Sequence, residues 1–162
     1  MAELTNLETK LGEVIGLAMA AQAATERVEK LTDDRRLKQQ LQTMRKEAAQ
    51  AEKDGTAVAA SINGKKGKIL AEARSVKTKG ATMMKTYLER GSDDLDGFEF
   101  LTMAEAGEVG HWTVLQELNK QGKHAGIRKL VSTHLPIQKR HLKDTMAASV
   151  HLAAKEDANA KS

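Results

Sequence analysis

The sequence predicts an all-α protein, and three features of its composition carry this prediction. Aromatic residues make up only 2% of the 162 residues, whereas β-sheet proteins place aromatic and β-branched side chains on their strands. Ala, Leu, Lys, Glu, Gln and Met dominate instead, and these residues have high helix propensity. The chain contains a single Pro. At this length we expect one domain with a substantial core.

The composition also excludes several classes of site. The chain has no Cys, which rules out disulfides, thiolate metal ligands and cysteine nucleophiles. Its first residues lack the basic segment and apolar run of a signal peptide. No window holds the run of about 18 apolar residues that a membrane span needs. We therefore expect a cytoplasmic protein that is not embedded in a membrane.

Residues 4–62 are predicted to form a helical hairpin. Apolar side chains recur at spacings of three and four over residues 4–31, which is typical of one face of a long helix. A second such run over residues 37–62 ends at a Gly- and Asn-containing stop, INGKKGK. Between the runs, Thr32 or Asp33 is expected to cap the second helix. The connection is short, so the two helices should pack antiparallel.

Residues 63–97 are predicted to be a long, partly helical crossover with a basic character. The segment NGKKGKILAEARSVKTKGATMMKTYLERG contains eight Lys or Arg against two Glu. Its helical pattern is weaker, and Gly80 is expected to break or loosen it. One interpretation is a solvated, lysine-rich surface helix. The other is a site for an anionic partner such as nucleic acid, although no nucleic-acid-binding motif is present and only Tyr87 is aromatic. The basic residues of that second interpretation are Lys65, Lys66, Lys68, Arg74, Lys77 and Lys79.

Residues 98–154 are predicted to form a second helical hairpin, followed by a frayed tail over 155–162. Its first helix should run from about residue 98 to 120 and its last from about residue 127 to 154. Pro136 lies within the last helix and should kink it or mark its restart, because proline has no backbone N–H. Two hairpins joined by a long crossover is the wiring of ferritin-like four-helix bundles.

Polar side chains interrupt the apolar faces of these helices. Glu105, Glu108 and His111 lie on or beside the apolar stripe of the helix over residues 98–120. The last helix and the second helix add His134, Gln138, His141, Glu47 and Gln50. A carboxylate on a buried face is costly unless it is paired, hydrogen-bonded or coordinated. Carboxylates and imidazoles on facing helices are suitable ligands for iron or manganese. The alternative is that these residues are polar helix margins and hydrogen-bonded core histidines.

Three short segments, MRKEAAQAEKDG, AEAGEVGHWTVL and LPIQKRHLKD, carry a likeness to a known family. Together with the hairpins and the crossover, they make nearly the whole chain resemble the ferritin-like superfamily, most of all the YciE/YciF-type group of small bacterial stress-associated proteins. The resemblance implies one Glu on each of the first and third helices and Glu-x-x-His on the second and fourth. Here the second-helix motif is Glu47-x-x-Gln50 and the fourth-helix motif is Gln138-x-x-His141. The first helix has no acid on its seam near Ala18.

The resemblance thus implies an altered metal site rather than an intact two-metal centre, because amides replace charged or imidazole ligands. The candidate ligands for Fe or Mn are Glu47, Glu105, Glu108, His111 and His141, with Gln50, Gln138 and His134 around them. We expect a non-enzymatic bundle protein with a stress-related or structural role, assembled as a homodimer or a larger oligomer. Two alternatives stay open: a metal-dependent oxidoreductase or iron-handling protein, and, less favoured, a basic nucleic-acid-binding protein.

Overall fold

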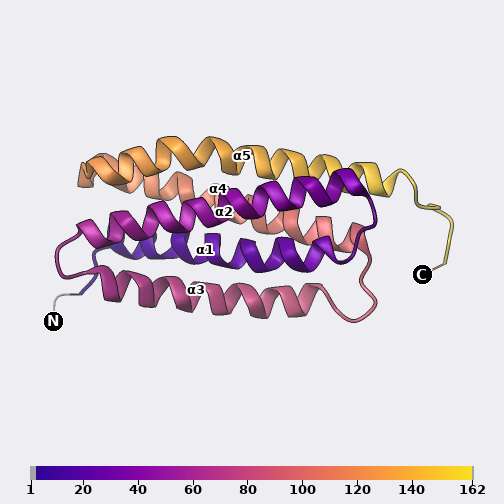
Figure 1. The fold of residues 1–162 in the computed structure, drawn as a ribbon, viewed down its shortest axis with the longest axis horizontal. Coiled ribbons are helices and arrows are strands. Elements are labelled where there is room, and N and C mark those ends of the chain that lie inside the picture. Colours follow the sequence, from indigo (N-terminus) through magenta and orange to yellow (C-terminus); the bar gives the residue numbers. More distant parts are fainter. Residues whose placement is uncertain (1–2, 162) are drawn as a thin grey trace.

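The computed structural model describes residues 3–161, which form long α-helices joined by short loops (Figure 1). No strand occurs in this part of the chain, so the all-α prediction is confirmed. None of its helices is both long enough and apolar enough to span a bilayer. The helices are α1 (Asn6–Glu29), α2 (Arg35–Ser61), α3 (Lys66–Tyr87), α4 (Asp94–Gly122) and α5 (Ala125–Ala153).

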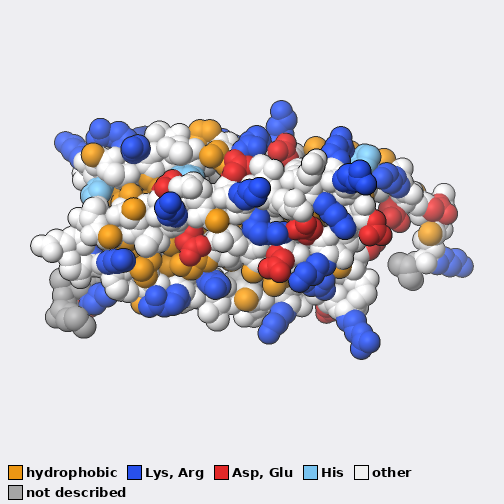
Figure 2. Space-filling model, in the orientation of Figure 1, with side chains coloured by type: hydrophobic (Ala, Val, Ile, Leu, Met, Phe, Trp, Pro, Cys, Tyr) orange, Lys and Arg blue, Asp and Glu red, His pale blue; other side chains and the backbone are white. Residues whose placement is uncertain are grey.

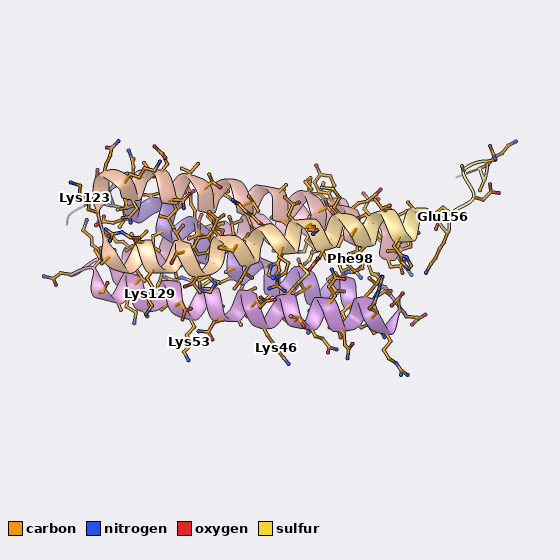
Figure 3. The ribbon with its side chains drawn as sticks, turned by 90° about the horizontal axis from the view of Figure 1, so that it is seen from above. Lys46, Lys53, Phe98, Lys123, Lys129 and Glu156 are labelled. Carbon is orange, nitrogen blue, oxygen red and sulfur yellow. The ribbon has the colours of Figure 1, made fainter. Side chains whose placement is uncertain are left out.

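Successive helices run in opposite directions along one long axis (Figure 1). α1 packs against α2 and α4, and α5 packs against α4 and α2, so these four helices surround a common interior. α3 packs mainly against α1 and has only slight contact with α4. Figure 3 looks down on α5, which lies between α4 and α2 in that view, while Lys46 and Lys53 of α2 point away from the bundle. The predicted pattern of two hairpins and a crossover is consistent with this packing.

The crossover helix differs from the sequence prediction at Gly80. α3 continues through this residue without a break, so the expectation that Gly80 interrupts the helix is wrong. A Cβ atom at Gly80 would lie 2.8 Å from the Cβ of Ala20 on α1. The close packing of α3 on α1 therefore requires a residue without a side chain here. We infer that this packing outweighs the helix-propensity penalty of glycine, which is about 1 kcal/mol.

The same close approach occurs nearer the start of α1. Cβ atoms at Gly12 and Gly16 would lie 2.8 Å from the carbonyl oxygen of Ile69 and 2.3 Å from that of Ala73. Both of these α3 residues are completely buried. α3 is thus seated directly on the backbone of α1.

Two helix starts differ from the sequence expectation, and aspartate caps explain both. Asp34, rather than Thr32 or Asp33, is the N-cap of α2: its carboxylate accepts a hydrogen bond from the Leu37 N–H at 3.1 Å. The predicted cap is therefore wrong. The Thr32 hydroxyl instead donates to the Asp94 carboxylate at 3.0 Å, which ties the α1–α2 loop to the start of α4.

α4 begins at Asp94, about four residues earlier than the apolar pattern predicts. Asp93 accepts a hydrogen bond from the Asp96 N–H at 2.9 Å, and Asp96 accepts one from the Asp93 N–H at 3.0 Å. This reciprocal pair is a capping box, which satisfies backbone donors that a helix start otherwise leaves unpaired.

Pro136 does not end a helix, since α5 is continuous from Ala125 to Ala153. The expected restart after this proline is therefore wrong. Pro136 and Ser132 are both exposed. The Ser132 carbonyl, which loses its usual helical partner four residues later, can therefore be hydrated at low cost.

The buried apolar residues form two clusters along the bundle. One cluster includes Leu11, Ile15, Trp112 and Leu115, and the other includes Val28, Leu41, Phe98 and Leu101. On α4 the stretch between the two clusters contains buried Glu105 and Glu108. The corresponding stretch of α5 contains Gln138, His141 and Thr145, and His134 lies just before it; all four are buried. A polar layer therefore crosses the middle of the bundle. On the outside, Lys or Arg and Asp or Glu side chains are mixed over the face in Figure 2.

Candidate functional site

Glu105 and Glu108 provide the acidic part of the polar layer. They lie three residues apart on α4, so their side chains share one helix face. Leu101 and Trp112 flank them on the same face and are also buried. The side chain of Glu105 is 1% exposed and Glu108 as a residue is 4% exposed. The apolar residues on either side bring both carboxyl groups into the interior.

α5 supplies the partners of Glu105, and α2 supplies a further carboxylate that contacts α5. The Gln138 amide donates a hydrogen bond to Glu105 Oε2, and His141 Nδ1 lies 3.7 Å from the same oxygen. The other ring nitrogen of His141, Nε2, lies 3.4 Å from Glu47 Oε1 on α2. Arg140 also donates to the Glu47 carboxylate. A continuous chain of polar contacts therefore runs from α4 through α5 to α2.

Burial and neighbouring charges shift the pKa values of the carboxyl and imidazole groups in this polar layer. It raises the pKa of Glu105, although the nearby His141 acts in the opposite direction. The pKa of Glu108 is raised well above its ordinary value by burial and, in addition, by the charge of Glu105. Burial alone would lower the pKa of His141, but Glu105 and Glu47 outweigh it, and the net shift is upward. The layer thus holds protons more tightly than the same groups would in water.

A second polar pair, His134 and Asp54, lies farther along α5 and α2. His134 Nε2 is 2.8 Å from Asp54 Oδ2, and Gln50 donates to the other Asp54 oxygen at 2.7 Å. The His134 ring also faces Trp112, with 5.8 Å between the ring centroids. Hydrogen bonds from His134 and Gln50 lower the pKa of Asp54 against the opposing effect of burial. Gln50 itself is exposed, so it lies outside the central layer.

Asp54 is the residue that sequence reasoning missed, although a signal for it was present. Glu47 and Asp54 are seven residues apart on α2, and His134 and His141 are seven apart on α5. Seven residues are two helical turns, so each pair shares a face. Because α2 and α5 run antiparallel, Glu47 meets His141 and Asp54 meets His134.

The polar contacts of His111 are with α1 and not with the other candidate ligands. His111 Nδ1 lies 3.1 Å from Glu13 Oε2 and 3.1 Å from Lys10 Nζ, both on α1. Its side chain is 41% exposed. His111 therefore belongs to a partly exposed contact between α4 and α1, which is separate from the Glu105–His141 pair.

The donor groups do not fit a two-metal centre. Within residues 3–161, no three His, Asp or Glu side chains are grouped so that they could hold a metal ion. The Gln138 amide already binds Glu105, and the Arg140 guanidinium already binds Glu47. A guanidinium beside a ligand carboxylate opposes the binding of a cation by Coulomb repulsion. Of the predicted residues, Glu105 contacts Gln138 and His141, and His141 contacts Glu47. Glu108 lies three residues after Glu105 on α4.

The chain matched no protein-family model, no curated protein and no solved structure. The resemblance to ferritin-like proteins therefore stays a prediction.

Proposed function

We propose that this chain is a non-enzymatic, ferritin-like bundle protein with a structural role, in which the polar layer is the remnant of a metal site. The observation that carries the proposal is the state of Glu105. This buried carboxylate is held by the Gln138 amide and faces His141, and Glu47 is held by Arg140. Protein groups thus occupy positions where a metal site would need open carboxylate oxygens.

In this proposal the layer fixes how the helices are aligned. A shift of α5 by one turn against α4 would move Gln138 away from Glu105 and leave a buried carboxylate without its donor. An unsatisfied buried polar group costs about 1–3 kcal/mol, and more when it is charged. The His141–Glu47 and His134–Asp54 contacts apply the same constraint between α5 and α2. Buried polar groups of this kind fix register in other helical assemblies.

The ferritin-like part of the proposal is supported by the order of the elements. The first hairpin is α1–α2, the crossover is α3 and the second hairpin is α4–α5. The polar residues that match the family motifs, Glu47 and His141, contact each other in the interior between the hairpins.

Metal analysis of the full chain, purified without chelators, tests the remnant site. We expect Fe and Mn far below one ion per chain, and oxidation of added Fe(II) in air no faster than in buffer. Glu99→Ala is the matched control, because Glu99 is exposed on α4. Stoichiometric metal that disappears in Glu47→Ala and Glu108→Ala, but persists in Glu99→Ala, would instead identify a metal-binding or iron-handling protein.

A second experiment tests the alignment role through Gln138→Leu. Removing the amide leaves Glu105 without its donor, so unfolding should become easier by about 1–3 kcal/mol. Trp112, the single Trp of the chain, is buried beside the layer and reports on packing. We expect retained far-UV circular dichroism but a weaker near-UV signal from Trp112. The exposed Gln116 gives the control Gln116→Leu. Equal behaviour of the two variants would contradict the alignment role.

A further inference from the structure

A cavity of about 240 Å³ lies between α1, α3 and α4. Its wall is apolar over most of its area and includes Leu17, Met83, Met84, Phe100, Leu101 and Met103. Met83 and Met103 are exposed, whereas Phe100 and Leu101 are buried, so the cavity runs from the surface inward. Methionine side chains are flexible and adapt to differently shaped ligands.

The packing of α3 explains why the cavity exists. α3 lies close against α1 at Gly80 and Ala20 but has only slight contact with α4. The α1 residues that face the space include Ala20 and Ala21, whose side chains are too small to fill it. Larger residues at these positions would remove the cavity, and close-packed interiors contain few voids of this size.

Glu108 lies at the buried part of this cavity. It is 4% exposed and lines the cavity together with Glu105. Unlike Glu105, it makes no hydrogen bond or ion pair with residues 3–161. Every fully buried side-chain oxygen or nitrogen of these residues has a partner, so the Glu108 oxygens must be open to the cavity. A carboxyl group on a mostly apolar wall is costly unless something in the cavity donates to it. The other charged groups of the cavity are Lys77, which is exposed, and His111, which contacts Glu13 and Lys10.

We propose that the cavity binds a small organic cation, a primary amine with an apolar body, whose ammonium group contacts Glu108. An ammonium group supplies the donors that the Glu108 carboxylate lacks, and hydrogen bonds between charged partners are the strong ones. Glu105 also lines the cavity and adds negative potential when it is ionised. The apolar body lies against the Met and Phe side chains of the wall.

The volume limits the size of the amine. A cavity of about 150 Å³ lined by apolar side chains accommodates benzene. A cavity of about 240 Å³ therefore has room for one ring with a short chain. 2-Phenylethylamine has this size. An organic anion would meet two carboxyl groups, and a neutral apolar molecule would leave Glu108 without a partner. A bare metal ion would find no group of three His, Asp or Glu ligands among residues 3–161 that could hold it.

Three probes of similar size test the proposal on the full chain by isothermal titration calorimetry. These are 2-phenylethylamine, the neutral 2-phenylethanol and the anionic phenylacetate. We expect the amine to bind at least about tenfold more tightly than the alcohol, and the anion not to bind measurably. In Glu108→Gln the preference for the amine should disappear, while Glu99→Gln, altered at an exposed position of α4, should keep it.

A second variant separates the cavity from surface effects. Ala104 lines the cavity on α4, and Ala104→Leu should fill part of it and abolish amine binding. Circular dichroism and the thermal midpoint show whether each variant folds, and bound amine should raise the midpoint of the wild type. Equal affinity for amine and alcohol, unchanged preference in Glu108→Gln, or no binding of the amine would overturn the proposal. So would Mn²⁺ binding that displaces the amine.

Discussion

The α1–α3 interface gives a sharp test of the fold, through the substitution Gly16→Ala. A Cβ atom at this position would lie 2.3 Å from the carbonyl oxygen of Ala73 and 2.8 Å from the Cβ of Val76. Ordinary contact begins near 3.4 Å, so α3 would have to retreat by about 1 Å. A gap of that size weakens the van der Waals attraction between the facing atoms of α1 and α3 by about a quarter to a half. The obstacle is a backbone carbonyl that cannot rotate away, so we expect the upper part of the overpacking range, about 2–3 kcal/mol.

Gly110→Ala is the matched control for this test. Gly110 is an exposed residue in the middle of α4, and a Cβ there would meet no atom within 4 Å. The same change should therefore stabilise the protein by up to about 1 kcal/mol through helix propensity. Urea denaturation followed by far-UV circular dichroism measures both variants. If the free energy of unfolding of Gly16→Ala lies within about 0.5 kcal/mol of the wild-type value, the close packing of α3 on α1 is refuted.

Three further substitutions test individual contacts. Burial raises the pKa of Glu108 above 4.5, so the folded state binds this proton more tightly than the unfolded state does. The free energy of unfolding should therefore fall as pH rises above that value, by at most about 1.4 kcal/mol per pH unit. Urea denaturation at a series of pH values measures this slope, and the slope should be smaller in Glu108→Gln. Asp93→Ala removes the cap of α4 and should cost about 1 kcal/mol, with faster hydrogen exchange confined to the first turn. Asp54→Ala leaves buried His134 without its partner and should cost about 1–3 kcal/mol in thermal or urea unfolding, whereas Lys53→Ala on the exposed face should be nearly neutral. The explanation for Glu108 is contradicted if Glu108→Gln has the same pH profile of stability as the wild type. The explanation for Asp93 is contradicted if amide hydrogen exchange in the first turn of α4 is unchanged, and that for Asp54 if Asp54→Ala and Lys53→Ala lose equal stability.

The helices could be predicted from the sequence because their signals are local. Apolar spacings of three and four indicate each long helix, and the Asn and Gly of INGKKGK indicate where α2 ends. The continuity of α3 could not be predicted in the same way. Gly80 looks like a helix breaker until its neighbour Ala20 on α1 is known. The start of α4 at Asp94 likewise depends on a reciprocal hydrogen bond rather than on apolar spacing.

The candidate site was predictable only where a residue lies at the centre of a helix face. Glu105 and His141 have buried neighbours on the same face in both directions, and both are buried. Gln50 and His111 lie at the margins of their faces, where a small rotation of the helix decides between interior and surface. Neighbouring helices set that rotation, so the sequence of one helix alone does not define it. Asp54 was missed although it lies seven residues after Glu47 on the same face of α2, because that spacing becomes informative only once α2 is known to pack against His134 and His141 of α5.

Glu105 and Glu108 have different contacts, which indicates that they have different roles. Glu105 is held by Gln138 and approached by His141, whereas Glu108, three residues later and also buried, adjoins a cavity. If both residues served only to align the helices, each should have a partner on a neighbouring helix. Replacing Glu105 by Met removes the acceptor of Gln138 and should destabilise the fold, whereas replacing Glu108 by Met removes the cost of keeping an unpaired carboxyl group in the interior. The variants Glu105→Met and Glu108→Met should therefore change stability in opposite directions near pH 7. Destabilisation by both would mean that Glu108 also serves the packing of the bundle, so this comparison separates alignment from ligand binding.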